Sequence, residues 1–334
     1  MPWAEPLRVA TYNAELTRAG PGLMIRDILG NKDQQISAVV EVIAALDADI
    51  LLLTGIDYDL GQVGITALAD RLSLAGVSYP HRLALRPNSG IPSGFDLDAN
   101  GRLGEARDAL AFGRFAGAAG MAVLSRYPIE MQNMRDFTGL LWQDLPGALL
   151  PPDLTQQMRA IQPLSTSGHY EIPIRINGMT LRLLAFYATP PVFDGPEDRN
   201  GRRNHDETAL WLRLLDGTLA MPPPAAPFVI LGQTNLDPVD GEGRPAALRA
   251  VLAHPAVQDP EPRGDHGRVE PGGDPALDTA LYDKIGGLRV EVVLPSADLK
   301  VAKSGVMWPS VADPLAATLA TASRHRPVWV DILP

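Results

Sequence analysis

The chain has 334 residues, of which 46% are hydrophobic and 20% are charged. This composition allows a buried core and excludes global disorder. The absence of Cys excludes disulfides, thiolate catalysis and zinc or iron–sulfur sites built on Cys. With 39 Asp and Glu against 29 Lys and Arg, the net charge is −10. We therefore expect no nucleic-acid partner and no binding to anionic membranes.

The sequence leaves two cellular locations open for this protein. No apolar run approaches the roughly 18 residues that a membrane-spanning helix needs, so we expect no membrane span. The first residues, Met1-Pro2-Trp3-Ala4-Glu5-Pro6, lack the apolar core of a signal peptide. The chain is therefore either cytoplasmic or the mature form of an exported protein that carries a new initiator Met.

Apolar periodicity predicts alternating strands and helices along the whole chain. Asn177-Gly178 lies between two alternating runs and predicts a tight hairpin, because both residues tolerate positive φ. The predicted strands are 7–12, 50–54, 121–125, 171–176, 180–188, 228–231, 288–294 and 328–332. The predicted helices are 33–45, 65–75, 204–218 and 246–253.

Two segments rich in Gly and Pro, near 79–120 and 134–168, are expected to be loop elaborations, and neither has a clear linker at its ends. The remaining strands and helices are mixed along the chain, with a hairpin inside the sheet. We therefore predict a single α/β (α+β) domain over 1–334 with layered sheets, and not a doubly wound parallel sheet.

Polar residues follow several of the predicted strands directly. Asn13 follows the first strand, Asn235 and Asp237 follow the strand at 228–231, and Ser323-Arg324-His325-Arg326 precedes the last strand. Polar side chains that meet at strand ends are a common way in which layered enzymes build a site.

Six segments in order carry a resemblance to a known family. They are RVATYN at 8–13, ADILLL at 48–53, GMAVLSRYPI at 120–129, LGQTN at 231–235, LRVEVVLPS at 288–296 and SRH at 323–325. The series resembles the endonuclease/exonuclease/phosphatase family. The resemblance implies a deoxyribonuclease-I-like, four-layer α-β-β-α sandwich of two mostly antiparallel sheets, and hydrolysis of phosphoesters with Mg²⁺ or a similar cation.

A longer segment, TPPVFDGPEDRNGRRNHDE at 189–207, is similar to a bacterial subgroup of that family whose members are often exported. This similarity favours an exported, periplasmic or extracellular, mature form over a cytoplasmic protein.

The catalytic motif departs from the family pattern. The resemblance places the metal-binding Glu at Gly55, the general His at Tyr187, and the Asp of a Gly-Asp-x-Asn motif at Gln233. It places the Asp of the terminal Asp-His pair at Arg324 and a further Asp at Glu291. The family-equivalent positions that keep the family residue are Asn13, Asn235 and His325.

These replacements remove the negative charge that the family pattern supplies for a hard cation. Gly55, Gln233, Glu291 and Arg324 together carry no net charge, whereas Mg²⁺ is usually held by carboxylates and water. An unperturbed Tyr, with a pKa near 10, is a poor substitute for a His in proton transfer. We therefore expect no metal at the family site.

The favoured function is a non-hydrolytic family member, a pseudoenzyme, that binds a small anion or a protein partner. Arg324, His325, Asn13 and Asn235 would bind the anion at the strand ends. The alternative is an active phosphatase or phosphodiesterase that uses Mg²⁺ or Mn²⁺ with rearranged ligands. In that case Asp57, Asp59 or Asp237 would supply a displaced carboxylate.

Arg202 and Arg203 lie in a cluster of donors just before a predicted helix, and such clusters suit anions. The same segment is rich in Asp and Glu, so the alternative is a loop of internal ion pairs.

Asp96-Leu97-Asp98-Ala99-Asn100-Gly101 matches the first half of a calcium loop. The Glu expected at the twelfth position is Arg107, with Asp108 next. A structural calcium at Asp96, Asp98, Asn100 and Asp108 is therefore one prediction, and a turn without metal is the other.

Overall fold

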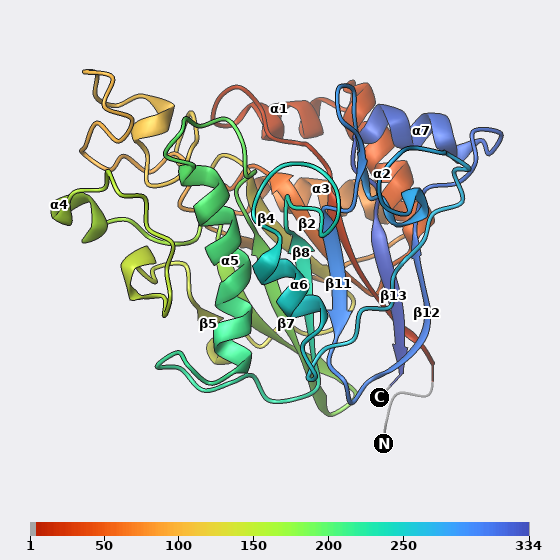
Figure 1. Cartoon of the computed structure of the whole chain (residues 1–334). Helices are drawn as coiled ribbons and strands as arrows, with labels where there is room; N and C mark the ends of the chain where they lie inside the picture. Colours follow the sequence, from red (N-terminus) through yellow and green to blue (C-terminus); the bar gives the residue numbers. More distant parts are fainter. Residues whose placement is uncertain (1–4, 334) are drawn as a thin grey trace.

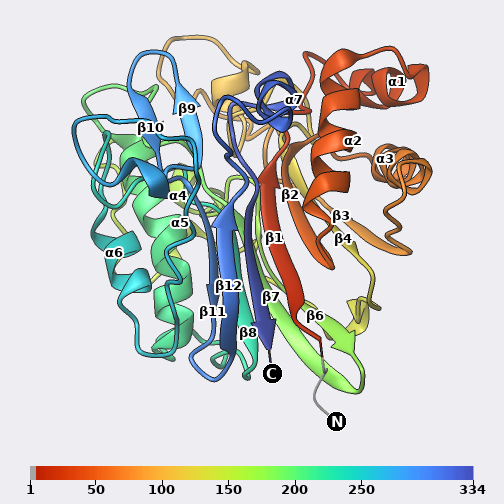
Figure 2. The same ribbon diagram turned by 90° about the vertical axis from the view of Figure 1, so that its right-hand side faces the viewer.

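Two β-sheets packed face to face form the centre of the computed structural model, which describes residues 5–333 (Figures 1 and 2). The first four residues of the N-terminal segment discussed above lie outside the described part. In the six-stranded sheet, only the neighbours β1 and β2 run parallel. Its strands in order are β12(Lys300–Val306), β13(Val328–Leu333), β1(Leu7–Asn13), β2(Ile50–Ile56), β4(Gly120–Ser125) and β3(His81–Leu85).

The second sheet has five strands, and only the neighbours β7 and β8 run parallel. Its strands in order are β11(Glu291–Pro295), β8(Phe228–Gln233), β7(Met179–Tyr187), β6(His169–Ile176) and β5(Arg135–Asp136). A separate two-stranded hairpin pairs β9(Ala280–Tyr282) with β10(Gly286–Leu288).

Helices cover the outer face of each sheet, so the molecule has four layers (Figure 2). One side carries α1(Leu23–Gly30), α2(Gln34–Leu46), α3(Val63–Leu74) and α7(Leu315–Ala322), and the other carries α5(Arg199–Leu215) and α6(Ala246–Leu252). The remaining helical turns are α4(Gln156–Arg159) and the 3₁₀ turns Ala106–Asp108, Met131–Asn133, Trp142–Asp144 and Pro275–Leu277. The predicted α-β-β-α sandwich of two mostly antiparallel sheets is confirmed.

Strand β2 shows why the apolar runs form the centre of the fold. Ile50 and Leu52 face the core between the sheets, whereas Leu51 and Leu53 face the core under the helices. Because successive side chains of a strand point to opposite faces, a strand buried on both sides must be apolar throughout.

The predicted hairpin at Asn177-Gly178 is confirmed as the link between β6 and β7. Asn177 has φ 47° and Gly178 has φ 89°, and a tight turn of this kind requires positive φ at both central residues.

Several elements were missed by the periodicity analysis. Strand β3 lies within the segment expected to be only a loop. Strand β12 is an edge strand with only two buried residues, and its sequence, KVAKSGV, has no apolar run that would predict a strand. The predicted strand at 288–294 is divided, because Leu288 pairs with Ala280 in the small hairpin while β11 begins at Glu291. No helix within residues 5–333 has the length and apolarity to cross a membrane, as expected.

Two buried groups with opposite pH behaviour meet beneath α5. His169 stacks against Phe186 and packs at a tilt against Trp211, and its Nε2 lies 2.8 Å from the Glu207 carbonyl oxygen. Burial lowers the pKa of His169 to about 3 and raises the pKa of the Glu207 carboxyl to about 7.

These two pKa shifts predict opposing slopes of stability with pH. Between pH 6.5 and about 3, folded His169 binds fewer protons than the unfolded chain, so its contribution to stability falls as pH falls. Between about pH 7 and 4.5, folded Glu207 binds more protons than the unfolded chain, so its contribution rises as pH falls.

We expect His169→Gln to gain stability relative to wild type as the pH is lowered from about 6.5 to 5, and Glu207→Gln to lose it. The limit for each is about 1.4 kcal/mol per pH unit. Urea unfolding at a series of pH values measures both slopes. Equal pH slopes for the two variants and wild type would contradict the prediction.

Candidate functional site

Strands β1, β2, β7 and β8 end at the edge of the sheets opposite the chain termini (Figure 2). A cleft of about 610 Å³ lies at these strand ends. Seven of the eight family-equivalent positions line it: Asn13, Gly55, Tyr187, Gln233, Asn235, Arg324 and His325. The eighth, Glu291, is buried behind His325. The structure therefore brings together residues that are spread over nearly the whole sequence.

Three amide side chains form the floor of the cleft. Asn13 Nδ2 donates to Gln233 Oε1 at 2.5 Å, and Gln233 Nε2 donates to Asn235 Oδ1 at 2.6 Å. Gln233 Oε1 also accepts from the Thr54 hydroxyl, and Asn13 Oδ1 accepts from the Glu15 N–H. Every amide oxygen of this network therefore already accepts a hydrogen bond.

Gly55 has no room for a side chain. A Cβ atom at this position would lie 2.3 Å from Asn13 Oδ1, and the residue has φ +65°, a region that favours glycine. A side chain at position 55 would thus collide with the Asn13 amide and approach the Glu15 backbone N–H.

His325 forms a buried pair with Glu291. Its Nδ1 lies 2.5 Å from Glu291 Oε1, and the Thr279 hydroxyl donates to the other carboxylate oxygen. The Thr279 hydroxyl in turn accepts the N–H of Val290 and of Glu291. This arrangement places the Nδ1 proton toward the carboxylate and fixes the ring at the back of the cleft.

Arg324 pairs with Glu15 and not with Glu291. Its Nε lies 2.7 Å from Glu15 Oε1, and its backbone N–H and the Ser323 hydroxyl donate to Glu15 Oε2. The positive charge expected to bind an anion is therefore balanced by a carboxylate on the same wall. The Glu291 carboxylate is instead bonded to His325 and Thr279.

Tyr187 stands beside the amide floor. Burial raises the pKa of its phenol to about 12, so it remains neutral and holds its proton at physiological pH. It cannot serve there as a general base near neutrality.

The three candidates for a displaced carboxylate have other roles. Asp57 accepts the N–H of Arg18 and of Ala119, and Asp59 caps the start of α3. Asp237 lines the cleft, but its oxygens accept three backbone N–H groups. The carboxylate that does face the floor is Glu15, which the sequence analysis did not single out.

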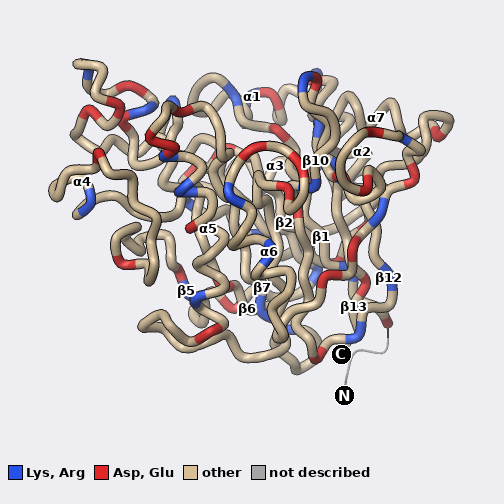
Figure 3. Tube along the Cα trace, viewed as in Figure 1, with Lys and Arg blue, Asp and Glu red and all other residues tan. Residues whose placement is uncertain are grey.

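The walls and mouth of the cleft are apolar and acidic. The apolar lining comes from Tyr187, Pro190, Pro191, Val192, Phe193, Tyr282, Ile285, Leu288 and Val290. Asp237, Asp240 and Glu242 lie on the loop between β8 and α6, whose acidic positions are red in Figure 3. Together with Glu15 they give four carboxylates against one guanidinium.

Arg202 and Arg203 do not line the cleft, contrary to the expected anion cluster. Arg203 is buried and donates to the carbonyl oxygens of Leu110, Pro163 and Leu164, while Arg202 donates to the Glu197 carbonyl. These arginines stabilise loops around α5.

Helix α5 also holds two loops of the cleft in place. Asn204 Nδ2 donates to the carbonyl oxygens of Thr189 and Thr234, at 2.6 and 2.7 Å. Glu207 accepts the N–H of Thr189 and of Thr166. The loop before Pro190 and the turn between Gln233 and Asn235 are thereby tied to one rigid helix.

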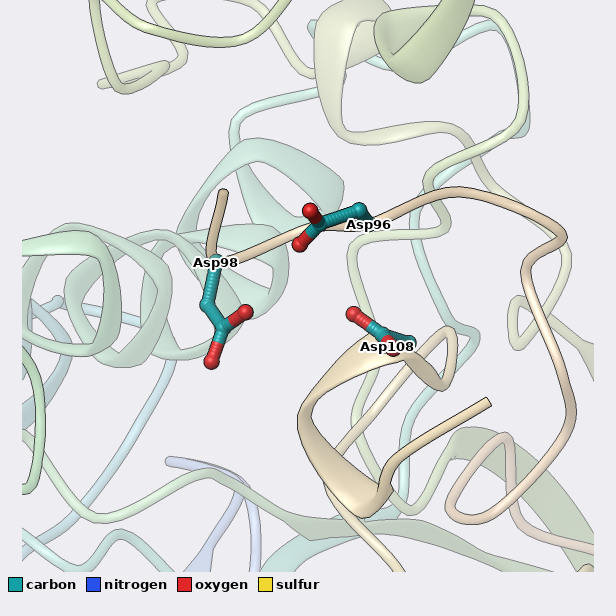
Figure 4. Close-up of side chains that lie close together, drawn as sticks. All are labelled: Asp96, Asp98 and Asp108. Carbon is teal, nitrogen blue, oxygen red and sulfur yellow. The ribbon is translucent and has the colours of Figure 1, made fainter. Parts of the chain in front are cut away.

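The calcium-like loop brings three carboxylates together, away from the cleft (Figure 4). Oxygens of Asp96, Asp98 and Asp108 lie within 4.8 Å of one another. Asp96 accepts the N–H of Asn100 and of Gly101, and the Asn100 side chain donates to Asp98. Both the metal and the metal-free turn are compatible with this donor set.

The sequence profile of the endonuclease/exonuclease/phosphatase family matches residues 10–325. The chain belongs to this family. No protein of curated function matched the chain in sequence.

Solved structures of the family share the fold. One, an endonuclease/exonuclease/phosphatase from Beutenbergia cavernae, has 18% identity and a TM-score of 0.56, covering 98% of this chain and 72% of that one. Another, a family protein from Leptotrichia buccalis, has 14% identity and a TM-score of 0.55, covering 98% and 99%. The sphingomyelinase C of Streptomyces griseocarneus has 16% identity and a TM-score of 0.53, covering 98% and 99%.

We expect Gly55→Ala to lower the stability by about 2 kcal/mol, from the cost of positive φ and the loss of an amide hydrogen bond. Thermal and urea unfolding measure the loss. Gly139→Ala is the control, because a Cβ there has no neighbour within 4 Å. A loss at Gly55 no larger than at Gly139 would contradict this account of the floor.

For the calcium-like loop, we expect Ca²⁺ to raise the melting temperature of the wild type. It should not raise that of Asp98→Ala, because one of the three carboxylate ligands is lost. Asp70→Ala, an exposed residue of α3, should respond like wild type. Identical responses of all three proteins to Ca²⁺ would leave the loop as a turn without metal.

Proposed function

We propose that this family member binds a ligand in its cleft without hydrolysing it. The observation that carries the proposal is the amide floor, in which Gln233 bonds to Asn13 and to Asn235 and stands where the resemblance places an Asp. A network of neutral amides with occupied oxygens has little affinity for a hard divalent cation.

The residues around the floor do not fit Mg²⁺ or Mn²⁺ at the family position. Glu15 accepts from Ser323 and Arg324, and Glu291 accepts from Thr279 and His325. A metal would have to displace these donors, and the Arg324 guanidinium beside Glu15 opposes a second positive charge. We therefore derive no step through a metal.

The residues also lack a complete set of groups for phosphoester hydrolysis without metal. The His325–Glu291 pair could accept or hold a proton, but Tyr187 keeps its own proton near neutral pH. Without a cation, the developing charge on a phosphoryl group would meet only one guanidinium, which Glu15 already balances.

The test is hydrolysis of a phosphomonoester and a phosphodiester with Mg²⁺ or Mn²⁺ titrated from zero to millimolar concentration. We expect turnover at background level with either cation, and the same level in His325→Ala. Metal-dependent turnover that disappears in His325→Ala would refute the proposal.

One observation favours a second candidate, an active phosphoesterase with rearranged ligands. Glu15 presents a carboxylate to the cleft next to Gly55, where the family Glu would be. In that case Glu15→Gln would abolish metal-dependent turnover, whereas Arg324→Ala would raise it by freeing the carboxylate. The non-hydrolytic proposal expects no effect of either change on turnover.

A further inference from the structure

The cleft's lining points to the chemical class of its ligand. We infer that it binds an organic cation with an apolar body, and not a phosphate or other small anion. This inference rests on the proposed function, because in a cleft without a catalytic metal the charges of the lining side chains determine which ligands bind.

Charge is the first argument. The four carboxylates of the cleft are Glu15, Asp237, Asp240 and Glu242, and Arg324 is the single opposing guanidinium. Because Arg324 forms an ion pair with Glu15, the three carboxylates on the loop between β8 and α6 have no opposing guanidinium among the described residues of the cleft. His325 is paired with the Glu291 carboxylate, so this pair adds no net positive charge to the cleft. A small anion would therefore be repelled and a cation attracted.

Two of the acidic side chains are held in place by the backbone. Asp237 accepts the N–H groups of Val239, Asp240 and Arg289, and Asp240 accepts the N–H of Gly273. These hydrogen bonds fix the positions of both carboxylates in the wall of the cleft, whereas Arg324 forms its salt bridge with Glu15.

The apolar walls of the cleft indicate that the uncharged part of the ligand is apolar. Tyr282 and Leu288 come from the β9–β10 hairpin, and Pro190 and Val192 come from the opposite loop. At the mouth, Phe193 is 81% exposed and Ile285 is 62% exposed. Exposed apolar side chains on both sides of a cleft indicate an apolar ligand surface between them.

The Tyr282 ring lines the cleft and already contacts one cation. The Arg324 guanidinium lies 5.8 Å from the centre of the ring, within the range of a cation–π contact. A cationic ligand would find this aromatic ring and the acidic loop in the lining of the same cleft, and would use the ring beside or in place of Arg324. A phosphate would find neither a free guanidinium nor a free helix terminus there.

Three probes with one apolar body and different charges test this inference: benzyltrimethylammonium, benzyl alcohol and benzyl phosphate. Isothermal titration or ligand-observed NMR measures each affinity. We expect the ammonium to bind at least about tenfold more tightly than the phosphate. Raising NaCl from about 50 to about 500 mM should reduce this preference, since the charges are partly screened.

Matched variants locate the effect. Asp240→Asn with Glu242→Gln should reduce the preference for the ammonium by about threefold or more, whereas Asp70→Asn, which removes the same type of charge on exposed α3, should not. Tyr282→Leu should weaken binding of the ammonium, and Tyr282→Phe, which keeps the ring, should retain it. Melting temperatures confirm that each variant is folded.

The inference is wrong if benzyl phosphate binds as tightly as the ammonium, if benzyl alcohol equals it, or if none of the three binds at millimolar concentration. These outcomes are separate from the hydrolysis assay. A metal-dependent activity would overturn the proposed function, whatever the probes do, and a preference for the phosphate without turnover would overturn only the class of ligand.

Discussion

The hydrogen bond between the Asn13 and Gln233 amides joins the two sheets at the floor of the cleft. Asn13 ends β1 of one sheet, and Gln233 ends β8 of the other. The Asn13 amide donates and the Gln233 amide accepts, so the two sheet ends are joined by a hydrogen bond between neutral groups. The amide pair thus contributes to both the geometry of the cleft and its low charge at the floor.

The rest of the cleft depends on this junction through short connections. Asn235, two residues after Gln233, donates to the Ala188 carbonyl, which ties the end of β8 to the loop after β7. Asn204 of α5 then bonds to the loops on both sides, at Thr189 and Thr234. The walls that would contact a ligand are therefore held by a helix and two strand ends, and rigid walls of this kind favour selective binding.

Much of the fold followed from the sequence, because burial on both faces leaves a clear pattern in strands such as β2. The Asn177-Gly178 hairpin was equally clear, since it requires residues that accept positive φ. The polar strand ends also predicted which residues would meet in the cleft. Elements without an apolar pattern were missed, as was β12 at the sheet edge. The role of Arg203 was misjudged, because an Arg that donates to buried carbonyl oxygens cannot be told from an Arg that binds an anion by the sequence around it.

Glu15 shows a different limit of sequence reasoning. It lies two residues after Asn13, so its position near the site could have been inferred, but its partner Arg324 comes from the other end of the chain. Only the fold shows that the Arg324 guanidinium is balanced by the Glu15 carboxylate. The charge of a site therefore has to be counted over its whole lining and not over the motif positions alone.

The backbone at Gly55 ties the neutral floor to the neighbouring turn. A Cβ atom at this position would lie 2.3 Å from Asn13 Oδ1, so a side chain there would push the Asn13 amide away from its bond to Gln233. A larger residue at position 55 would thus weaken the junction between the sheets. In this chain the stability of the fold and the neutrality of the floor depend on the same few contacts, and charge is displaced outward, to the acidic loop at the mouth of the cleft.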